Sequence, residues 1–253
     1  MRIVNEHLNP APAELEAPSP AGYLLLAAEV DRRPMFLPGS RSKRRMLAEI
    51  TALTRQLPAA TGDHVVRATV FRGFAHLAFG ENHGLLRRAA AAGRLTRPAR
   101  YDVVVLVETV TPEAAAALRE HPAYARLAGR VRHAARRTYE LAAGNPRNMG
   151  DVDATRPGVF LFNFFYADDE RELVPVWEYT AGWWHVNTGL DNSRVLAPLD
   201  GEPREYGIVN HCRWDRLRDV APRMVFRRSF RRFVLANFAA NGISAQPTLY
   251  RLA

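Results

Sequence analysis

Cysteine and lysine are almost absent from this chain. Cys212 is the only cysteine, so no internal disulfide can form and a metal site built from several cysteines is excluded. Lys43 is the only lysine, so almost all basic residues are arginines. The net charge is +9, but no stacking aromatics or RNA-binding motif accompany it. We therefore attribute the arginines to coding bias and expect no nucleic-acid partner.

Long apolar runs are also missing. No run approaches the ~20 residues that a membrane-spanning helix needs. The first residues lack the apolar core of a signal peptide, so we expect a cytoplasmic protein with no membrane partner. The chain has 253 residues, 47% of them hydrophobic, and can bury a sizeable core in one large or two small domains.

Motifs of several common enzyme classes are absent as well. The sequence has no phosphate-binding glycine loop, dinucleotide fingerprint, serine-nucleophile elbow or zinc-ligand spacing. The carboxylates at 168–172 stand at a predicted helix start, where negative charge is favoured electrostatically. We therefore predict no metal site.

What the sequence does contain is an order of strands and helices that occurs twice. Strands are predicted at 23–31, 64–74 and 101–109 in the first half, and at 159–166, 192–198, 206–214 and 247–252 in the second. Helices are predicted at 43–57, about 85–92, from 112, from 122 to about 143, 168–186 and 217–238, the last possibly broken near Pro222.

The two halves align as a weak internal repeat. Ala27 falls on Asn163, and Val105 falls on Asn210. A βαββαβ unit leaves one sheet face bare, and two such units can pack sheet to sheet around a barrel. The predicted fold class is therefore α+β, with tandem ferredoxin-like repeats forming a pseudo-dimer. The predicted parts are a Pro-rich arm at 1–21, a first repeat at 22–150 with an insertion at about 75–100, and a second repeat at 157–253.

Two predicted strands of the second half carry polar residues inside apolar runs. These residues are Asn163 in the first strand, and Asn210, His211 and Trp214 in the second. A buried polar group costs about 1–3 kcal/mol unless it is hydrogen-bonded, so each is either bonded within the fold or kept for a ligand. By strand alternation Asn210 and Trp214 share a face with Tyr206, and His211 points the other way. The aligned positions of the first half hold Ala, Val and Thr, which places the expected site in the second half.

The second half resembles the antibiotic biosynthesis monooxygenase family of the dimeric α/β-barrel superfamily. The resemblance is carried by Phe162-Asn163-Phe164, the helix Leu173–Trp184, Thr188-Gly189-Leu190 with Asn192-Ser193, and the strand 206–213 followed by Trp214-Asp215. It covers about residues 157–253. Cofactor-free oxygenases of this family act on anthrones and similar polyketide phenols with a strand Asn, a strand-end Trp and a basic residue.

The resemblance implies that Asn163, Trp214 and an arginine of 223–232, for which we favour Arg228, are catalytic. An Asn amide can hold an oxyanion, an Arg can lower the pKa of the substrate, and a Trp can exclude water. His211 is added as a candidate base because histidine titrates near neutral pH, with a helix-packed His as the alternative. The candidate substrate-binding residues are Tyr206, Asn210, Trp177, Trp184 and Phe165, although crowded tryptophans of one helix more often fill a core than stack on a substrate.

The predicted function is a cofactor-independent monooxygenase acting on an aromatic or polyketide-like small molecule in secondary metabolism. A polyketide cyclase of the same fold and a non-catalytic haem or hydrophobic-ligand binding protein stay open. Haem-degrading relatives ligate iron through a helix His, which residues 216–238 lack, so only His211 and His185 remain as unusual ligands. An interaction protein whose basic helix docks an acidic partner is a third hypothesis. We expect either a monomer with an internal pseudo-dimer or a homodimer.

Overall fold

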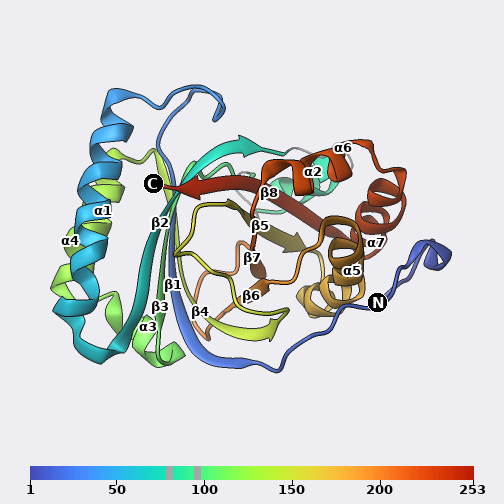
Figure 1. Cartoon of the computed structure of the whole chain (residues 1–253), viewed down its shortest axis with the longest axis horizontal. Coiled ribbons are helices and arrows are strands. Elements are labelled where there is room, and N and C mark those ends of the chain that lie inside the picture. The colour runs from blue at the N-terminus through green and yellow to red at the C-terminus, as the bar shows by residue number, and fades with distance from the viewer. Residues whose placement is uncertain (78–81, 94–97) are drawn as a thin grey trace.

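The computed structural model describes residues 1–77, 82–93 and 98–253. Within them, eight antiparallel strands form a closed barrel in the order β1-β3-β2-β8-β5-β7-β6-β4 (Figure 1). Each half of the chain contributes four neighbouring strands, in the orders β4-β1-β3-β2 and β8-β5-β7-β6. The strands are β1 (Ser19–Glu29), β2 (Val65–His76), β3 (Val103–Thr109), β4 (Arg137–Asn148), β5 (Val159–Ala167), β6 (Ser193–Pro198), β7 (Ile208–Trp214) and β8 (Ile243–Leu252).

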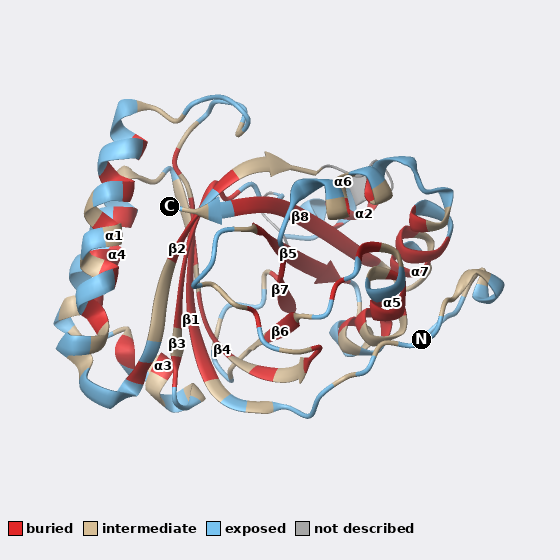
Figure 2. Cartoon of the chain, viewed as in Figure 1, coloured by how far each residue is buried: buried red, intermediate tan, exposed pale blue. Residues whose placement is uncertain are grey.

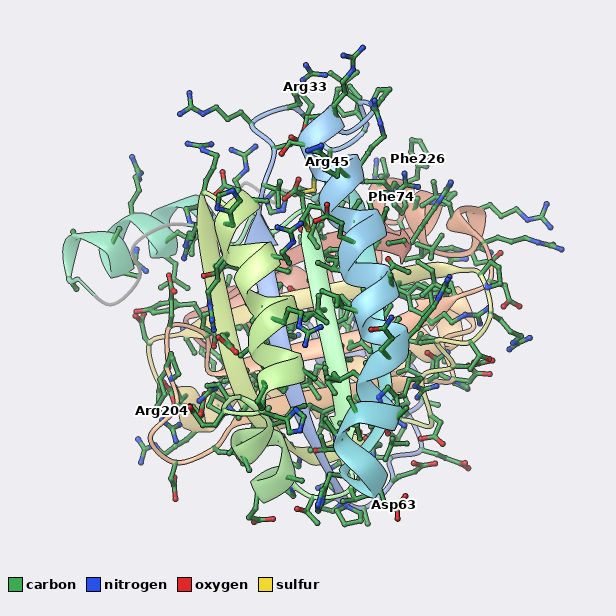
Figure 3. The ribbon with its side chains drawn as sticks, turned by 90° about the vertical axis from the view of Figure 1, so that its left-hand side faces the viewer. Arg33, Arg45, Asp63, Phe74, Arg204 and Phe226 are labelled. Carbon is green, nitrogen blue, oxygen red and sulfur yellow. The ribbon has the colours of Figure 1, made fainter. Side chains whose placement is uncertain are left out.

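Helices cover the barrel on two opposite sides (Figures 1 and 2). On one side, α1 and α4 lie side by side across the strands of the first half (Figure 3). On the other, α5, α6 and α7 cover the strands of the second half. No described helix is both long and apolar enough to cross a membrane. The helices are α1 (Arg41–Thr61), α2 (Asn82–Ala91), α3 (Pro112–Leu118), α4 (Pro122–Ala134), α5 (Leu173–Thr188), α6 (Leu217–Phe226), the π-helical η4 (Phe230–Leu235), α7 (Ala236–Ala240) and the 3₁₀ turns η1 (Glu6–Leu8), η2 (Gly62–His64) and η3 (Glu170–Glu172).

Alternating side chains of each strand divide the core into an inner and two outer clusters. In β5, Phe160, Phe162 and Phe164 point into the barrel, whereas Leu161 and Phe165 point toward α5 and α7. Figure 2 shows β5 and β7 buried along their whole length and β2 mostly half-buried, and the helices are buried mainly on the faces turned toward the strands. The barrel interior is filled largely by aromatic side chains: Tyr23, Phe71, Tyr101, Tyr139, Phe160, Phe162, Phe164, Tyr166, Tyr206 and Tyr250.

The segment before β1 runs along the helices of the second half. The backbone of Val4 and the carboxamide of Asn237 exchange two hydrogen bonds of 3.0 Å each. Arg2 and Asn241 exchange a similar pair. Gly182 allows the close approach, because a Cβ there would lie 2.2 Å from the carbonyl oxygen of Ala11. The Pro-rich arm is thus strapped onto the half of the chain that is remote from it in sequence.

Three sequence predictions about secondary structure are wrong. The helix from 122 ends at Ala134 rather than near 143, and 137–148 is strand β4. Residues 140–143 (Glu-Leu-Ala-Ala) favour a helix, but the segment pairs with β1 and β6, and Tyr139 and Leu141 fill the barrel interior, so tertiary pairing overrides helix propensity. The helix predicted at 217–238 is divided into α6, η4 and α7, and the last strand begins at Ile243 instead of Pro247.

The predicted alignment of the halves is wrong by one residue in its first strand. Ala27 packs inside the barrel, whereas Asn163 points toward the helices. The directly opposed pair Leu26–Val105 also faces helices, as the pair Asn163–Asn210 does in the second half. The helix-facing surface is therefore apolar in the first half and polar at this point of the second. Part of the predicted insertion at 75–100 lies outside the described residues, and α2 occupies 82–91.

Candidate functional site

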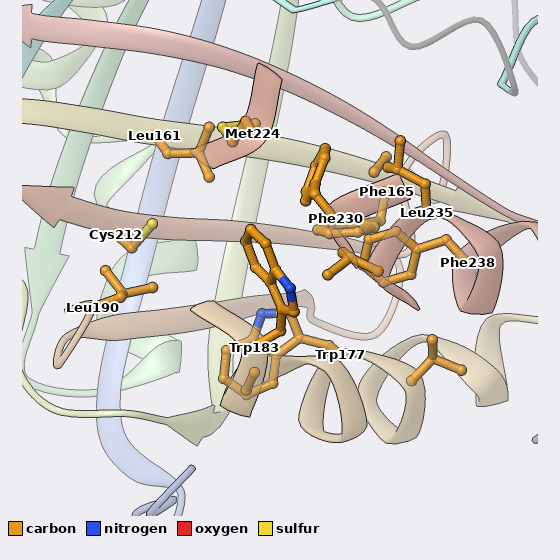
Figure 4. Close-up of a cluster of buried hydrophobic side chains, with 14 of the residues drawn as sticks. Leu161, Phe165, Trp177, Trp183, Leu190, Cys212, Met224, Phe230, Leu235 and Phe238 are labelled. Atoms are coloured by element: carbon orange, nitrogen blue, oxygen red, sulfur yellow. The ribbon is translucent and has the colours of Figure 1, made fainter. Parts of the chain in front are cut away.

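A small buried cavity lies between the outward face of β5–β7 and helix α5. Its volume is about 20 Å³, room for about one water molecule. Figure 4 shows apolar side chains of β5, β7, α5 and the C-terminal helices gathered in this region. The cavity is lined by Met149, Leu161, Asn163, Phe165, Trp177, Ala181, Trp184, Leu190, Ser193, Asn210, Cys212, Trp214 and Phe238.

Strand alternation and register bring the polar side chains of the lining together. Asn163 on β5 is directly opposite Asn210 on β7, and Cys212 on β7 is directly opposite Ser193 on β6. Directly opposed side chains of antiparallel strands have Cβ atoms about 4.5–5.5 Å apart. The three strands therefore present a cluster of polar side chains, Asn163, Asn210, Ser193 and Cys212, in an otherwise apolar cavity wall.

The Asn163 carboxamide is the polar group without a partner. The side chain is only 7% exposed, and its Oδ1 accepts no hydrogen bond from any described residue. By contrast, Oδ1 of Asn210 accepts a bond of 2.7 Å from the Ser193 hydroxyl. A buried acceptor without a partner costs about 1–3 kcal/mol, which a ligand hydroxyl that donates to Oδ1 would offset.

Tryptophans form the walls around this amide. Trp177 and Trp184 come from α5, and Trp214 comes from the end of β7. Nε1 of Trp214 donates to Oγ1 of Thr188 at 3.0 Å, and that hydroxyl donates to the Trp184 carbonyl oxygen at 2.6 Å. Trp183 lies outside the lining, where its Nε1 donates to the Ser229 hydroxyl. Aromatic walls of this kind suit a flat apolar ligand.

None of the described residues that line the cavity is charged. The lining contains no Asp, Glu, His, Lys or Arg, and its one titratable group is the thiol of Cys212. Burial raises the pKa of that thiol well above its ordinary value, so it is protonated at neutral pH. The site therefore favours a neutral ligand, because no side chain would compensate a charge removed from water.

Three of the predicted site residues lie elsewhere. His211 points into the barrel, its ring 4.1 Å from that of Phe162, and burial lowers its pKa to about 3, so it is neutral. Tyr206 precedes β7, and its ring packs in the barrel interior 5.0 Å from that of Tyr139. The prediction that Tyr206 shares the face of Asn210 is wrong because the strand starts only at Ile208, after a turn at Gly207. Arg228 is exposed in the junction between α6 and η4.

The other six predicted residues line the same cavity: Asn163, Asn210, Trp214, Trp177, Trp184 and Phe165. Sequence reasoning did not assign Ser193 or Thr188 to the site. Period-two alternation within β6 could have placed Ser193 beside Asn210, but no pattern in the sequence indicates the bond between Thr188 and Trp214.

A haem group does not fit the cavity. Its described lining contains no histidine, and the Cys212 thiol is held protonated by burial. His211 is enclosed in the barrel, and His185 is an exposed residue whose Nδ1 contacts the Leu190 carbonyl oxygen at 2.9 Å. Within 1–77, 82–93 and 98–253, no three His, Cys, Asp or Glu side chains could share a metal ion. We derive no chemistry through haem.

No family model and no curated protein matches the sequence. Solved structures do match. An anthrone oxidase-like protein is 12% identical and has a TM-score of 0.60, with 96% of this chain and 94% of that one covered. A putative monooxygenase from Fusobacterium nucleatum is 6% identical, with a TM-score of 0.54 and coverages of 92% and 93%. A putative chlorite dismutase is 10% identical, with a TM-score of 0.52 and coverages of 94% and 96%. At these identities the likeness shows the fold alone, and this chain shares the dimeric α/β-barrel fold of these proteins.

Proposed function

We propose that this chain is an oxygenase that acts on a neutral aromatic small molecule without a resident cofactor. The observation that supports it most is the Asn163 carboxamide, which is buried, without a partner and surrounded by three tryptophans. Neighbours of the same fold named as an anthrone oxidase-like protein and as a putative monooxygenase support an oxygenase-like function.

In this proposal Asn163 holds the substrate oxygen. Its Nδ2 donates to a phenol or enol oxygen and stabilises the negative charge that develops when the substrate is deprotonated. The bond is strong because tryptophan and leucine side chains exclude water from the site. The described lining contains no base, so the proton passes to water as the substrate enters from solvent, and compounds whose carbanion is delocalised over aromatic rings are acidic enough for this. The O₂ molecule is small and apolar and suits the same environment.

Anthrone is the substrate class that meets these requirements. It is neutral, flat and tricyclic, and its enol is a phenol. With O₂ it gives anthraquinone and water: the methylene carbon loses two hydrogens and gains a carbonyl oxygen, and the second oxygen atom leaves as water. We infer a role in polyketide-type secondary metabolism from this substrate class.

The test is oxygen uptake with anthrone and spectroscopic detection of anthraquinone, corrected for reaction without protein. Asn163→Leu should lower the protein-dependent rate by roughly a hundredfold or more, the usual effect of losing an oxyanion donor. Arg228→Ala serves as the matched control and should keep the rate. A rate equal to that without protein, or an unchanged rate in Asn163→Leu, contradicts the proposal.

A non-catalytic ligand-binding protein is the second candidate, favoured by the uncharged lining. It predicts that anthraquinone quenches tryptophan fluorescence while anthrone drives no oxygen uptake above background. A polyketide cyclase is less well supported, because an aldol-type ring closure needs a base and the described lining supplies none.

We also infer that the two halves are tandem ferredoxin-like repeats and that the barrel is an internal pseudo-dimer. The equal strand orders β4-β1-β3-β2 and β8-β5-β7-β6 support this. Sedimentation equilibrium tests it: a monomeric mass is expected, because both repeats are already paired within one chain.

A further inference from the structure

The Trp214 indole separates the buried cavity from an open polar crevice at the surface. The crevice has a volume of about 470 Å³ and lies beside the turn after α5. Trp214 lines both spaces, whereas Thr188 lines only the crevice. The crevice is lined by Asp151, Asp153, Arg156, Thr188, Gly189, Asp191, Asn192, Arg213, Trp214, Asp215 and Asp219.

The rest of this wall is tied firmly to the barrel. Asn192 exchanges two hydrogen bonds of 2.8 and 2.9 Å with the backbone of Arg213. The Leu190 carbonyl oxygen contacts Nδ1 of His185 at 2.9 Å, and the Ser193 carbonyl oxygen accepts from the Met149 backbone at 2.8 Å. Loop 189–193 is therefore held by several bonds to the backbone.

The Trp214 side chain makes one hydrogen bond, the 3.0 Å contact of its Nε1 with the Thr188 hydroxyl, and is otherwise held by packing, with its ring 6.1 Å from that of Trp184. A typical hydrogen bond contributes about 0.5–1.5 kcal/mol net, so loss of this one should raise the population of the rotated indole about two- to tenfold. Once the indole has rotated into the crevice, its N–H can donate to water. This lowers the free energy that is lost when the hydrogen bond to Thr188 breaks.

We propose that ligands enter the cavity from the polar crevice by rotation of the Trp214 indole, and that Thr188 is the positioning residue that holds the indole closed. The inference rests on the proposed function in one respect, that the cavity receives a substrate. Some such movement is required, because about 20 Å³ cannot hold an aromatic ring. The indole is the part of the wall that both borders solvent-filled space and has a single polar tether.

The first experiment needs no ligand of the protein. Acrylamide quenching of tryptophan fluorescence is measured in the full chain, and the Trp214 contribution is the difference between proteins with and without Trp214→Phe. Thr188→Val keeps the shape of the side chain but removes the acceptor, and should raise the quenching constant of Trp214 roughly two- to tenfold. Thr188→Ser keeps the acceptor and should behave as the unsubstituted chain. The proposed role of Thr188 is overturned if the quenching constant is unchanged in Thr188→Val. It is also overturned if Thr188→Ser behaves like Thr188→Val.

The second experiment follows the rate at which anthraquinone quenches the fluorescence in a stopped-flow instrument. Thr188→Val should speed association by a similar factor, and Trp214→Phe should speed it as well. In a double-mutant cycle, Thr188→Val should add nothing in the Trp214→Phe background, because both act through one bond. Additive effects overturn the proposal. If quenching behaves as expected but oxygen uptake is absent, the proposed entry route past Trp214 is supported and the proposed oxygenase function is contradicted.

Discussion

Asn163 and Asn210 lie directly opposite each other on β5 and β7, yet only Asn210 has a partner for its carbonyl oxygen. The carbonyl oxygen of the same residue type is thus bonded within the fold in one strand and left without a partner in the neighbouring strand. The two residues form a matched pair in which structural and functional roles can be separated.

Leucine substitutions at these two positions should have opposite effects on stability. Asn163→Leu removes an unpartnered buried amide and should raise the free energy of unfolding by about 1 kcal/mol while abolishing substrate turnover. Asn210→Leu leaves the buried Ser193 hydroxyl without its acceptor and should lower that free energy by about 1–3 kcal/mol. Urea denaturation measures both. Destabilisation by Asn163→Leu as large as that by Asn210→Leu would show that Asn163 is bonded within the fold.

His211 should make the protein less stable in acid. Its pKa is lowered from 6.5 to about 3 in the folded chain, chiefly by burial, so the unfolded chain binds the proton first. The free energy of unfolding should therefore fall as the pH drops from about 6.5 toward 3, by up to about 1.4 kcal/mol per pH unit. His211→Phe should flatten this slope, measured by urea denaturation at pH 7 and 4.5.

His76, whose pKa burial lowers to about 4, should account for the acid sensitivity that remains. Oxygen uptake should survive in His211→Phe because the imidazole faces away from the cavity. Loss of turnover with a retained melting temperature would restore the histidine as a candidate base.

Substitution of Arg228 and of Arg194 should have very different effects on the free energy of unfolding, although both are arginines of the second half. Arg228 is exposed, and Arg228→Ala should change the free energy of unfolding by less than about 0.5 kcal/mol. Arg194 is 8% exposed and pairs with Glu108 at 3.0 Å and Asp151 at 2.5 Å. Arg194→Ala removes this partner from the half-buried Glu108, which keeps its ion pair with Arg67 at 2.8 Å, and should cost about 1–3 kcal/mol. Thermal denaturation distinguishes the two, and a large loss of turnover in Arg228→Ala would contradict its placement.

The Cys212 thiol should report on opening of the cavity. It is 1% exposed, and burial raises its pKa, so a disulfide reagent such as DTNB should modify the native protein slowly at pH 8. Denaturant should release one reactive thiol per chain. Saturating anthraquinone should slow the native reaction further, because the ligand and the reagent compete for the same space. Rapid stoichiometric modification of the native protein would show that the thiol lies outside a closed cavity.

Period-two alternation within single strands correctly predicted which strand residues face the cavity wherever the strands are regular. Asn163, Asn210 and Trp214 converge because each stands in a regular strand whose outward face is buried by α5. Alternation and helical periodicity predicted the wrong position for residues that lie outside regular strands and helices. Tyr206 precedes the turn at Gly207, and Arg228 lies between α6 and a π-helical segment that changes the phase of the helix.

Strand β4 shows a different limit. Its residues 140–143 (Glu-Leu-Ala-Ala) favour a helix, and the strand conformation of the segment depends on pairing with β1 and β6. Neither partner is visible from a local window. The same holds for the bond between Thr188 and Trp214, which joins a helix end to a strand end and leaves no local pattern.

Strand β8 pairs with β2 on one side and β5 on the other, so the last strand of this sequence joins the two halves. Until residues 243–252 have been synthesised, β2 presents an unpaired edge and the barrel interior is open to solvent. The aromatic side chains that fill it are then exposed together with a free strand edge, a combination that promotes aggregation. Folding of this chain should therefore be slow, because the barrel closes only when strands that are distant in sequence pair.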